Sequence, residues 1–283
     1  MAAITITIAI EKGGAGKTVT AQNLAYLMGD EGKRVLCIDT DPQGNLTSSL
    51  SGGEEITSPL FRGKGLYNLI DGFKGNSQAK DYIVETNYEN VDMIPCNAQT
   101  PRINKRIIEI YDDIQLESDD EVKKAVSQEC YLEYFLNQIK DEYDYIVIDT
   151  QPTRDALLLT NALAAADYVL IPTLAEAYSE TSAFRTYSVC NGLKESGKYH
   201  LKGAGVFLNN VDKKAAATKE ILEQCQAALG SSLYDIIVPT SRTVNSSVNK
   251  NLPVCYMAKT QPVAKAYVSI YEELKKRLAK LEG

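Results

Sequence analysis

Residues 4–18 read ITITIAIEKGGAGKT, and this stretch joins a β-branched apolar run to a glycine-rich loop. Ile4–Ile10 has the composition of a buried strand, whereas the apolar positions of Thr18–Glu31 recur at helical spacing. Glycines let the intervening chain turn tightly and approach a bound group closely. A strand, a glycine loop and a helix in this order predict an α/β fold with a ligand at the start of the helix.

Strand and helix patterns continue to alternate along the rest of the chain. The other apolar, β-branched runs are Val35–Ile38, Val91–Ile94, Tyr145–Ile148, Tyr168–Ile171, Val206–Leu208 and Ile236–Val238. Most of them are continuous rather than alternating, which is typical of strands covered on both faces. Helical patterns occupy Tyr131–Lys140, Ala216–Leu229 and Val263–Leu281. This order predicts a single doubly wound, mainly parallel sheet with helices on both faces.

The chain shows no internal domain boundary, so we expect residues 1–283 to form one domain. Its first strand pattern starts at Ile4, and we therefore expect no separate N-terminal DNA-binding domain. No stretch of about 18 apolar residues occurs, so we expect no membrane span. No basic segment precedes an apolar block near the first residue, so we expect no secretory signal either.

The composition argues against several classes of site. The six cysteines are scattered without a C-x-x-C pair, which speaks against structural zinc and redox pairs. The only histidine is His200, so histidine-based metal or triad chemistry is not expected. A net charge of −7 argues against a generally basic nucleic-acid binder. A local basic patch is still compatible with DNA binding, because affinity depends on the face that meets the phosphates.

The glycine loop meets the physical demands of a bound polyphosphate. Its backbone N–H groups can point at phosphate oxygens, and the helix start adds its positive dipole end. Lys17 supplies charge to the β- and γ-phosphates, and the Thr18 hydroxyl can bind Mg²⁺. Glu11 stands where the usual G-x-x-x-x-G-K-[ST] pattern has its first glycine. The predicted nucleotide-binding residues here are Lys12, Gly13, Gly14, Ala15, Gly16, Lys17, Thr18 and Val19.

The same loop resembles the deviant Walker A motif of the ParA/MinD group of P-loop ATPases. That group has an extra lysine at the position of Lys12. The resemblance implies ATP and Mg²⁺ as cofactors. It also implies that Lys12 reaches across a nucleotide-sandwich dimer to the partner's phosphates and acts in catalysis together with Lys17.

Two acidic segments follow predicted strands. Residues 39–45 read DTDPQGN and resemble the switch I segment of ParA/Soj partition proteins. By this resemblance Asp41 orients or activates the attacking water, and Asp39 lies near the Mg²⁺ shell. Asp149 ends an apolar run and resembles a Walker B carboxylate, which holds Mg²⁺ through water. Gln151 replaces a proline of the family pattern and Arg154 is unusual there, so the details of switch II stay open.

Relatives place a wall of the base pocket at the end of the Val206–Leu208 strand. By resemblance Asn209 contacts the exocyclic amine of adenine, although asparagine is also a common turn residue at strand ends. The loop that begins at Pro239 would form the other wall. Relatives often bind DNA nonspecifically beyond this loop, where Arg242 and Lys250 are the basic residues here. The wider group of basic candidates is Lys213, Lys214, Lys219, Arg242, Lys250, Lys259 and Lys265, each of which also reads as an ordinary surface charge.

The amphipathic segment Val263–Leu281 has two readings. MinD proteins end in a membrane-targeting helix, but the charges here favour a helix packed on the domain. The resemblance covers nearly the whole chain and implies a slow, partner-stimulated ATPase for plasmid or chromosome partition. It implies an ATP-dependent homodimer, nonspecific DNA and a ParB-like partner in the cytoplasm, at the nucleoid. A MinD-like membrane-positioning ATPase and a ParA-like ATPase that positions a non-DNA protein cargo are the alternatives.

Overall fold

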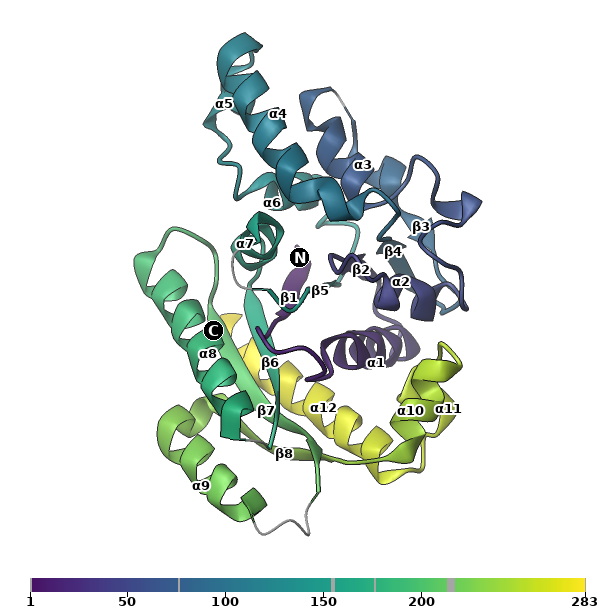
Figure 1. Ribbon diagram of the computed structural model, residues 1–283, viewed down its shortest axis with the longest axis vertical. Helices are drawn as coiled ribbons and strands as arrows, with labels where there is room; N and C mark the ends of the chain where they lie inside the picture. Colours follow the sequence, from purple (N-terminus) through teal and green to yellow (C-terminus); the bar gives the residue numbers. More distant parts are fainter. Residues whose placement is uncertain (1, 76, 154–155, 176, 213–216, 283) are drawn as a thin grey trace.

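The computed structural model describes residues 2–75, 77–153, 156–175, 177–212 and 217–282. Within these ranges one sheet of eight strands forms the centre of the molecule, in the order β3-β4-β2-β5-β1-β6-β7-β8 (Figure 1). The strands are β1 Ile4–Ile8, β2 Val35–Asp39, β3 Val84–Glu85, β4 Val91–Ile94, β5 Tyr145–Asp149, β6 Tyr168–Leu174, β7 Gly203–Val211 and β8 Leu233–Pro239. All neighbours pair in parallel except β3 and β4, which are antiparallel.

Helices cover both faces of this sheet (Figure 1). They are α1 Lys17–Asp30, α2 Asn45–Leu50, α3 Leu66–Asp71, α4 Ile103–Glu117, α5 Glu121–Ala125, α6 Tyr131–Leu136, α7 Leu157–Ala164, α8 Ala177–Ser196, α9 Ala217–Leu229, α10 Arg242–Asn249, α11 Val254–Met257 and α12 Pro262–Glu282. The predicted doubly wound, mainly parallel sheet is therefore confirmed.

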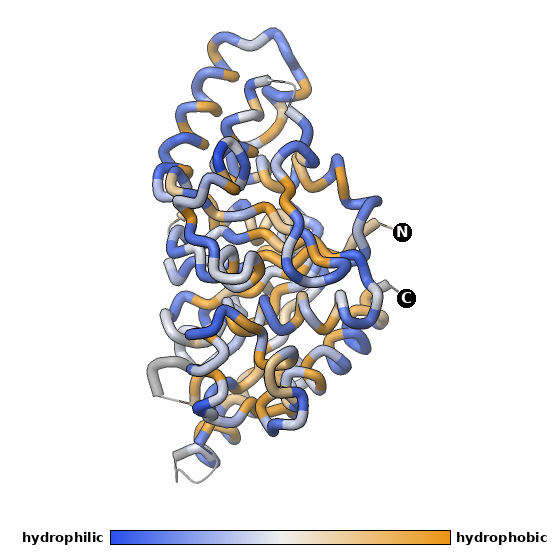
Figure 2. The backbone as a smooth tube through the Cα atoms, turned by 90° about the vertical axis from the view of Figure 1, so that its right-hand side faces the viewer, coloured by the Kyte–Doolittle hydropathy of each residue, from blue (hydrophilic) through white to orange (hydrophobic). Residues whose placement is uncertain are grey.

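Successive residues of a strand pack in hydrophobic cores on opposite faces of the sheet. Along β5, Val147 packs in the core that includes α1 and α12, whereas Ile146 and Ile148 pack in the core of α3, α4, α6 and α7. A further core joins β6 and β7 to α8 and α9. Figure 2 shows hydrophobic residues gathered along the central strands and hydrophilic residues along the outer turns of the helices. Both faces of the strands are thus buried, which explains their continuous apolar runs.

Several predicted bounds were wrong. The helix predicted over Tyr131–Lys140 ends at Leu136, because the following residues form tighter turns in which the Ile139 N–H bonds to the Leu136 carbonyl at 3.0 Å. Strands β6 and β7 are longer than predicted. They pair with each other beyond the apolar runs, as far as Leu174 opposite Asn209, so polar residues also belong to the strands. The two-residue strand β3 was not predicted at all.

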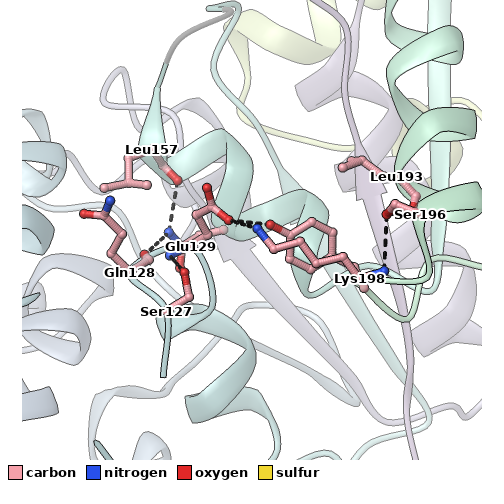
Figure 3. A network of polar contacts seen from close by, with 9 residues as sticks. Ser127, Gln128, Glu129, Leu157, Leu193, Ser196 and Lys198 are labelled. Carbon is pink, nitrogen blue, oxygen red and sulfur yellow. Dashed lines mark hydrogen bonds and ion pairs between the residues drawn. The ribbon is translucent and has the colours of Figure 1, made fainter. Parts of the chain in front are cut away.

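A polar network connects the segment before α6 to α7 and to the chain after α8 (Figure 3). The Glu129 carboxylate accepts hydrogen bonds from Lys198 Nζ and the Tyr199 hydroxyl, each at 2.5 Å. The side-chain amide of Asn161 donates to the Gln128 carbonyl at 2.9 Å. These contacts join the helix layers over the two halves of the sheet. Among the described residues, no helix is both long and apolar enough to cross a bilayer.

Candidate nucleotide and magnesium site

The glycine loop lies between the carboxyl end of β1 and the start of α1. Gly14 and Gly16 have positive φ angles of 74° and 92°, a backbone region that favours glycine. Gly16 directly precedes α1, and a Cβ atom at this position would collide with the side-chain amide of Asn209. The glycines of the motif therefore give the loop the shape that presents its N–H groups at the start of α1.

Lys17 is the first residue of α1 and is only 6% exposed. Its ammonium donates hydrogen bonds to the Ile10 carbonyl at 3.1 Å and to the Lys12 carbonyl at 3.2 Å. Burial lowers the pKa of Lys17, while the charges of Asp149 and Asp41 raise it. The lysine therefore lies inside the curve of the loop, beside two carboxylates, where it can neutralise phosphate charge.

Thr18 and Asp149 meet at the adjoining edge of the sheet. The Thr18 hydroxyl donates to Asp149 Oδ2 at 2.6 Å. Asp149 is 0% exposed, and its Oδ1 atom has no hydrogen-bond partner in the described part of the chain. Burial, and after it the charge of Asp39, raises the pKa of Asp149 well above its usual range. A buried carboxylate oxygen without a partner is costly, so a cation beside it would remove that cost.

This donor set suits Mg²⁺. A threonine hydroxyl and a carboxylate are hard oxygen ligands, and Mg²⁺ usually adds substrate phosphates and waters to one or two such groups. No group of three or more His, Cys, Asp or Glu residues that could hold a metal forms within the described ranges. Thr18 and Asp149 would therefore hold the ion together with phosphate oxygens rather than as a complete protein site.

Asp39 and Asp41 occupy different positions although they are two residues apart. Asp39 is buried, and its carboxylate accepts from the Thr47 N–H and hydroxyl, each at 2.8 Å, and from the Asp41 N–H at 3.1 Å. Burial raises the pKa of Asp39 to about 6. Asp41 instead lines the cavity described below, and its Oδ1 accepts from the Gln43 N–H at 2.9 Å. Asp39 thus shapes the turn that presents Asp41, and its place near the Mg²⁺ shell stays a prediction.

A cavity of about 500 Å³ extends from the glycine loop to the carboxyl ends of β7 and β8 and to α10. Its lining residues are Gly13, Gly14, Gly16, Lys17, Thr18, Val19, Asp41, Asn45, Pro152, Asn209, Asn210, Val238, Pro239, Thr240, Ser241, Arg242, Val244, Asn245, Val248 and Tyr267. The volume falls in the usual range of small-molecule sites. The sequence-predicted base-pocket residues Asn209 and Pro239 therefore share one cavity with the phosphate loop.

The remaining predicted residues differ in whether they line this cavity. Ala15 is buried behind the loop, and Lys12 is half-buried at its edge with its carbonyl bound to Lys17. Arg242 lines the cavity, whereas Lys250 is exposed at the far end of α10. Of the wider basic group, Lys219 pairs with Glu223 and Lys259 with Asp30, both at 3.8 Å. Arg154, Lys213 and Lys214 lie outside the described residues.

The sequence did not single out Thr47, Tyr267 or the α10 residues Val244, Asn245 and Val248, of which all but Thr47 line the cavity. Thr47 reads as an ordinary position of a short helix, and Tyr267 as one apolar residue of the amphipathic stripe of α12. Their roles depend on contacts with residues far away in the chain, which no local pattern records. A buried tyrosine in an otherwise aliphatic stripe is the one signal that could have marked Tyr267.

Comparisons with known proteins agree with this geometry. A family model described as an AAA domain matches residues 3–203. Soj, a sporulation initiation inhibitor protein of Bacillus subtilis, is 28% identical over 269 residues, which cover 95% of this chain and 97% of that protein. The chromosome-partitioning ATPase Soj of Treponema pallidum is 27% identical over 270 residues, covering 95% and 96%. An ATP complex of McdA from Cyanothece shares the fold, with a TM-score of 0.77, 22% identity and 96% coverage of both chains.

Proposed function

This chain belongs to the AAA domain family and is a ParA/Soj-type P-loop ATPase, and we propose that it is the Mg-ATP-driven switch of a DNA partition system. Mg-ATP binding drives two subunits together face to face, and the dimer binds DNA nonspecifically. Slow hydrolysis of ATP to ADP and phosphate, stimulated by a ParB-like partner, releases the DNA. The protein works in the cytoplasm, at the nucleoid.

The observation that carries this proposal is the Thr18–Asp149 contact of 2.6 Å beside the buried Lys17 ammonium, at the head of a nucleotide-sized cavity. Lys17 binds the terminal phosphates, and Thr18 with Asp149 holds the metal. When bound, Mg²⁺ neutralises charge that develops on the phosphate oxygens. Asp41 faces the same cavity and orients the attacking water. Positioning and electrostatics of this kind account for most of phosphoryl-transfer catalysis.

The DNA part of the proposal is supported by the names of relatives and by the basic residues of α10. The Treponema pallidum relative is a chromosome-partitioning ATPase, and it aligns with 95% of this chain. Arg242 at the start of α10 and Lys250 just after its end are two exposed cations, one at each end of this helix. Exposed Lys and Arg side chains bind DNA through its phosphates and without regard to sequence.

The C-terminal helix α12 offers no free apolar stripe for the membrane alternative. The stripe of α12 packs in the core, where Tyr267, Ile270 and Leu274 are at most 1% exposed. The prediction that Val263–Leu281 packs on the domain is therefore confirmed. A non-DNA cargo remains the second candidate function, and a DNA-binding measurement separates it from partition.

Lys12→Ala tests the sandwich-dimer step. Lys12 is half-buried at the edge of the loop and does not line the cavity of its own subunit, so we expect the variant to keep ATP binding. It should lose ATP-dependent dimers and turnover. Size-exclusion chromatography with light scattering, in ATP and in ADP, gives the answer. Lys105→Ala, at a lysine that is 84% exposed and pairs with Glu109, is the matched control and should dimerise normally. ATP-driven dimers that survive in Lys12→Ala would contradict this role.

A further inference from the structure

Asn209 makes its main contact with the phosphate loop. Its side-chain amide donates to the Ala15 carbonyl at 2.8 Å, and the same nitrogen lies where a Cβ on Gly16 would be. The residue is only 6% exposed at the end of β7. Because a carbonyl can only accept, this contact fixes the orientation of the amide, with the nitrogen toward the loop and Oδ1 away from it.

Tyr267 of α12 contacts the oxygen of the Asn209 side-chain amide. Its hydroxyl donates to Asn209 Oδ1 across 3.4 Å, and the tyrosine is 1% exposed. Burial raises the pKa of Tyr267, so the hydroxyl keeps its proton and acts as a donor. Thr20 of α1 also holds this part of the phosphate loop, since its hydroxyl donates to the Gly16 carbonyl at 2.7 Å.

The exocyclic amine of adenine is a hydrogen-bond donor and needs an acceptor. The one acceptor on the Asn209 side chain is Oδ1, and this atom already accepts from the hydroxyl of Tyr267, which also lines the cavity. The donor end of the amide is already bound to the loop. The geometry thus places the short hydrogen bond of the Asn209 amide at the phosphate end of the cavity.

We propose that Asn209 is a positioning residue that holds the Ala15–Gly16 part of the phosphate loop in shape, and that Tyr267 fixes the orientation of Asn209 from α12. This inference rests on the proposed ATP binding and assigns a different role from base recognition to the residue. It also means that α12, which packs across α1 and β8, contributes to phosphate affinity.

Binding of three ligands separates the two roles. Isothermal titration with ATP, GTP and inorganic tripolyphosphate, all with Mg²⁺, measures affinity for base and phosphates together and for phosphates alone. If Asn209 holds the loop, Asn209→Ala weakens all three by a similar factor, about tenfold for one lost hydrogen bond that leaves a buried carbonyl unpaired. The ratio of ATP to GTP affinity then stays the same. Unchanged tripolyphosphate affinity together with a smaller ATP preference would overturn the proposal.

Tyr267→Phe keeps the ring and removes only the hydroxyl, so it remains informative if Asn209→Ala folds poorly. We expect a smaller loss, about two- to fivefold, that is again equal for the three ligands. Tyr271→Phe is the matched control on the same helix, because the Tyr271 hydroxyl binds Glu31 instead of the loop, and its affinities should equal those of wild type. Wild-type affinity for all three ligands in Tyr267→Phe would show that Tyr267 does not fix the orientation of Asn209. Failure of the wild type to bind ATP would instead reject the proposed function.

Discussion

Lys17 places a buried cation within the curve of the glycine loop. Its buried ammonium is solvated by the Ile10 and Lys12 carbonyls instead of water. Phosphate oxygens can replace these neutral acceptors, and hydrogen bonds between charged partners are roughly twice as strong as neutral ones. Exchange of partners by one side chain is then enough for binding, and the glycine backbone keeps its shape. The motif predicted that Lys17 binds phosphate, and the residue lines the cavity.

At the residue scale, Asp41→Ala should separate binding from hydrolysis. Asp41 lines the cavity, and among the described residues its carboxylate accepts from the Gln43 N–H rather than from the glycine loop, so ATP affinity should change little. Hydrolysis should fall by about 10²–10⁴-fold, the usual effect of losing a group that orients or activates a nucleophile. Phosphate release and size-exclusion chromatography would show ATP-bound dimers that do not turn over. Hydrolysis at the wild-type rate would show that Asp41 has another role.

The residues of the phosphate loop could be predicted from the sequence because they all lie in one short segment. The same is true of Asp149, whose strand and acidic end are local features. Thr47 and Tyr267 could not be predicted, because their roles depend on distant partners, Asp39 in one case and Asn209 in the other. Sequence reasoning also placed Asp39 near the metal, which stays a prediction, and it did not foresee the hydrogen bonds from Asp41 and Thr47 to this carboxylate.

At the scale of elements, adjacent parallel strands bring the acidic groups together. β2 pairs with β5 so that Asp39 lies opposite Asp149, and β5 pairs with β1, from which the glycine loop leaves. Three carboxyl strand ends therefore meet beside the start of α1, as expected at the switch point of an open α/β sheet. The alternation of strands and helices in the sequence predicted that ligands bind at the carboxyl ends of the strands. It could not predict the order of the strands in the sheet, which brings these three ends together.

The α1–α12 contact gives a pH-dependent prediction. Glu31, just after α1, accepts from the Tyr271 hydroxyl and from Lys275 Nζ at 2.9 Å, and these bonds lower the pKa of Glu31. A lowered folded-state pKa stabilises the fold above the ordinary pKa of a glutamate, and the stabilisation is lost as the pH falls. Glu31→Gln should therefore lower the free energy of unfolding at neutral pH by up to about 1 kcal/mol, since the group is partly exposed.

Urea unfolding of Glu31→Gln at neutral pH and near about pH 3.5 measures this difference, which should shrink toward zero at the lower pH. Glu223→Gln is the control, because Glu223 forms an exposed pair with Lys219 and should show little effect at either pH. An equal loss of stability at both pH values would mean that packing, rather than the charge of Glu31, is responsible.

Helix α10 carries the prediction for DNA contacts. If Arg242 and Lys250 bind phosphates, the double change to alanine should weaken ATP-dependent DNA binding and reduce the salt slope of log K by about 2. Fluorescence anisotropy over a salt series gives the slope, after titration confirms that the variant still binds ATP, since Arg242 lines the cavity. Lys105→Ala combined with Lys276→Ala removes the same charge at exposed lysines outside the candidate group and should keep the slope. An unchanged slope in the α10 variant would place the DNA surface on another element.

On the scale of the whole molecule, the cavity joins segments from both ends of the chain. Residues 13–19 form one side of it, and residues 238–248 with Tyr267 form the other. The fold class and the phosphate half were predictable from local patterns, whereas the base half depends on long-range packing of β7, β8, α10 and α12. The net charge of −7 likewise does not show the local placement of the cations on which the proposed DNA binding would depend.

The central claim is that ATP controls whether the protein binds DNA. The most direct test is binding to a nonspecific duplex at two salt concentrations, with ATP, with ADP and without nucleotide, for wild type and for Lys17→Ala. The account predicts salt-sensitive binding only by the ATP-loaded wild type, because Lys17→Ala loses the buried cation that binds the terminal phosphates. DNA binding that is independent of nucleotide, or its absence in every nucleotide state, would contradict the account.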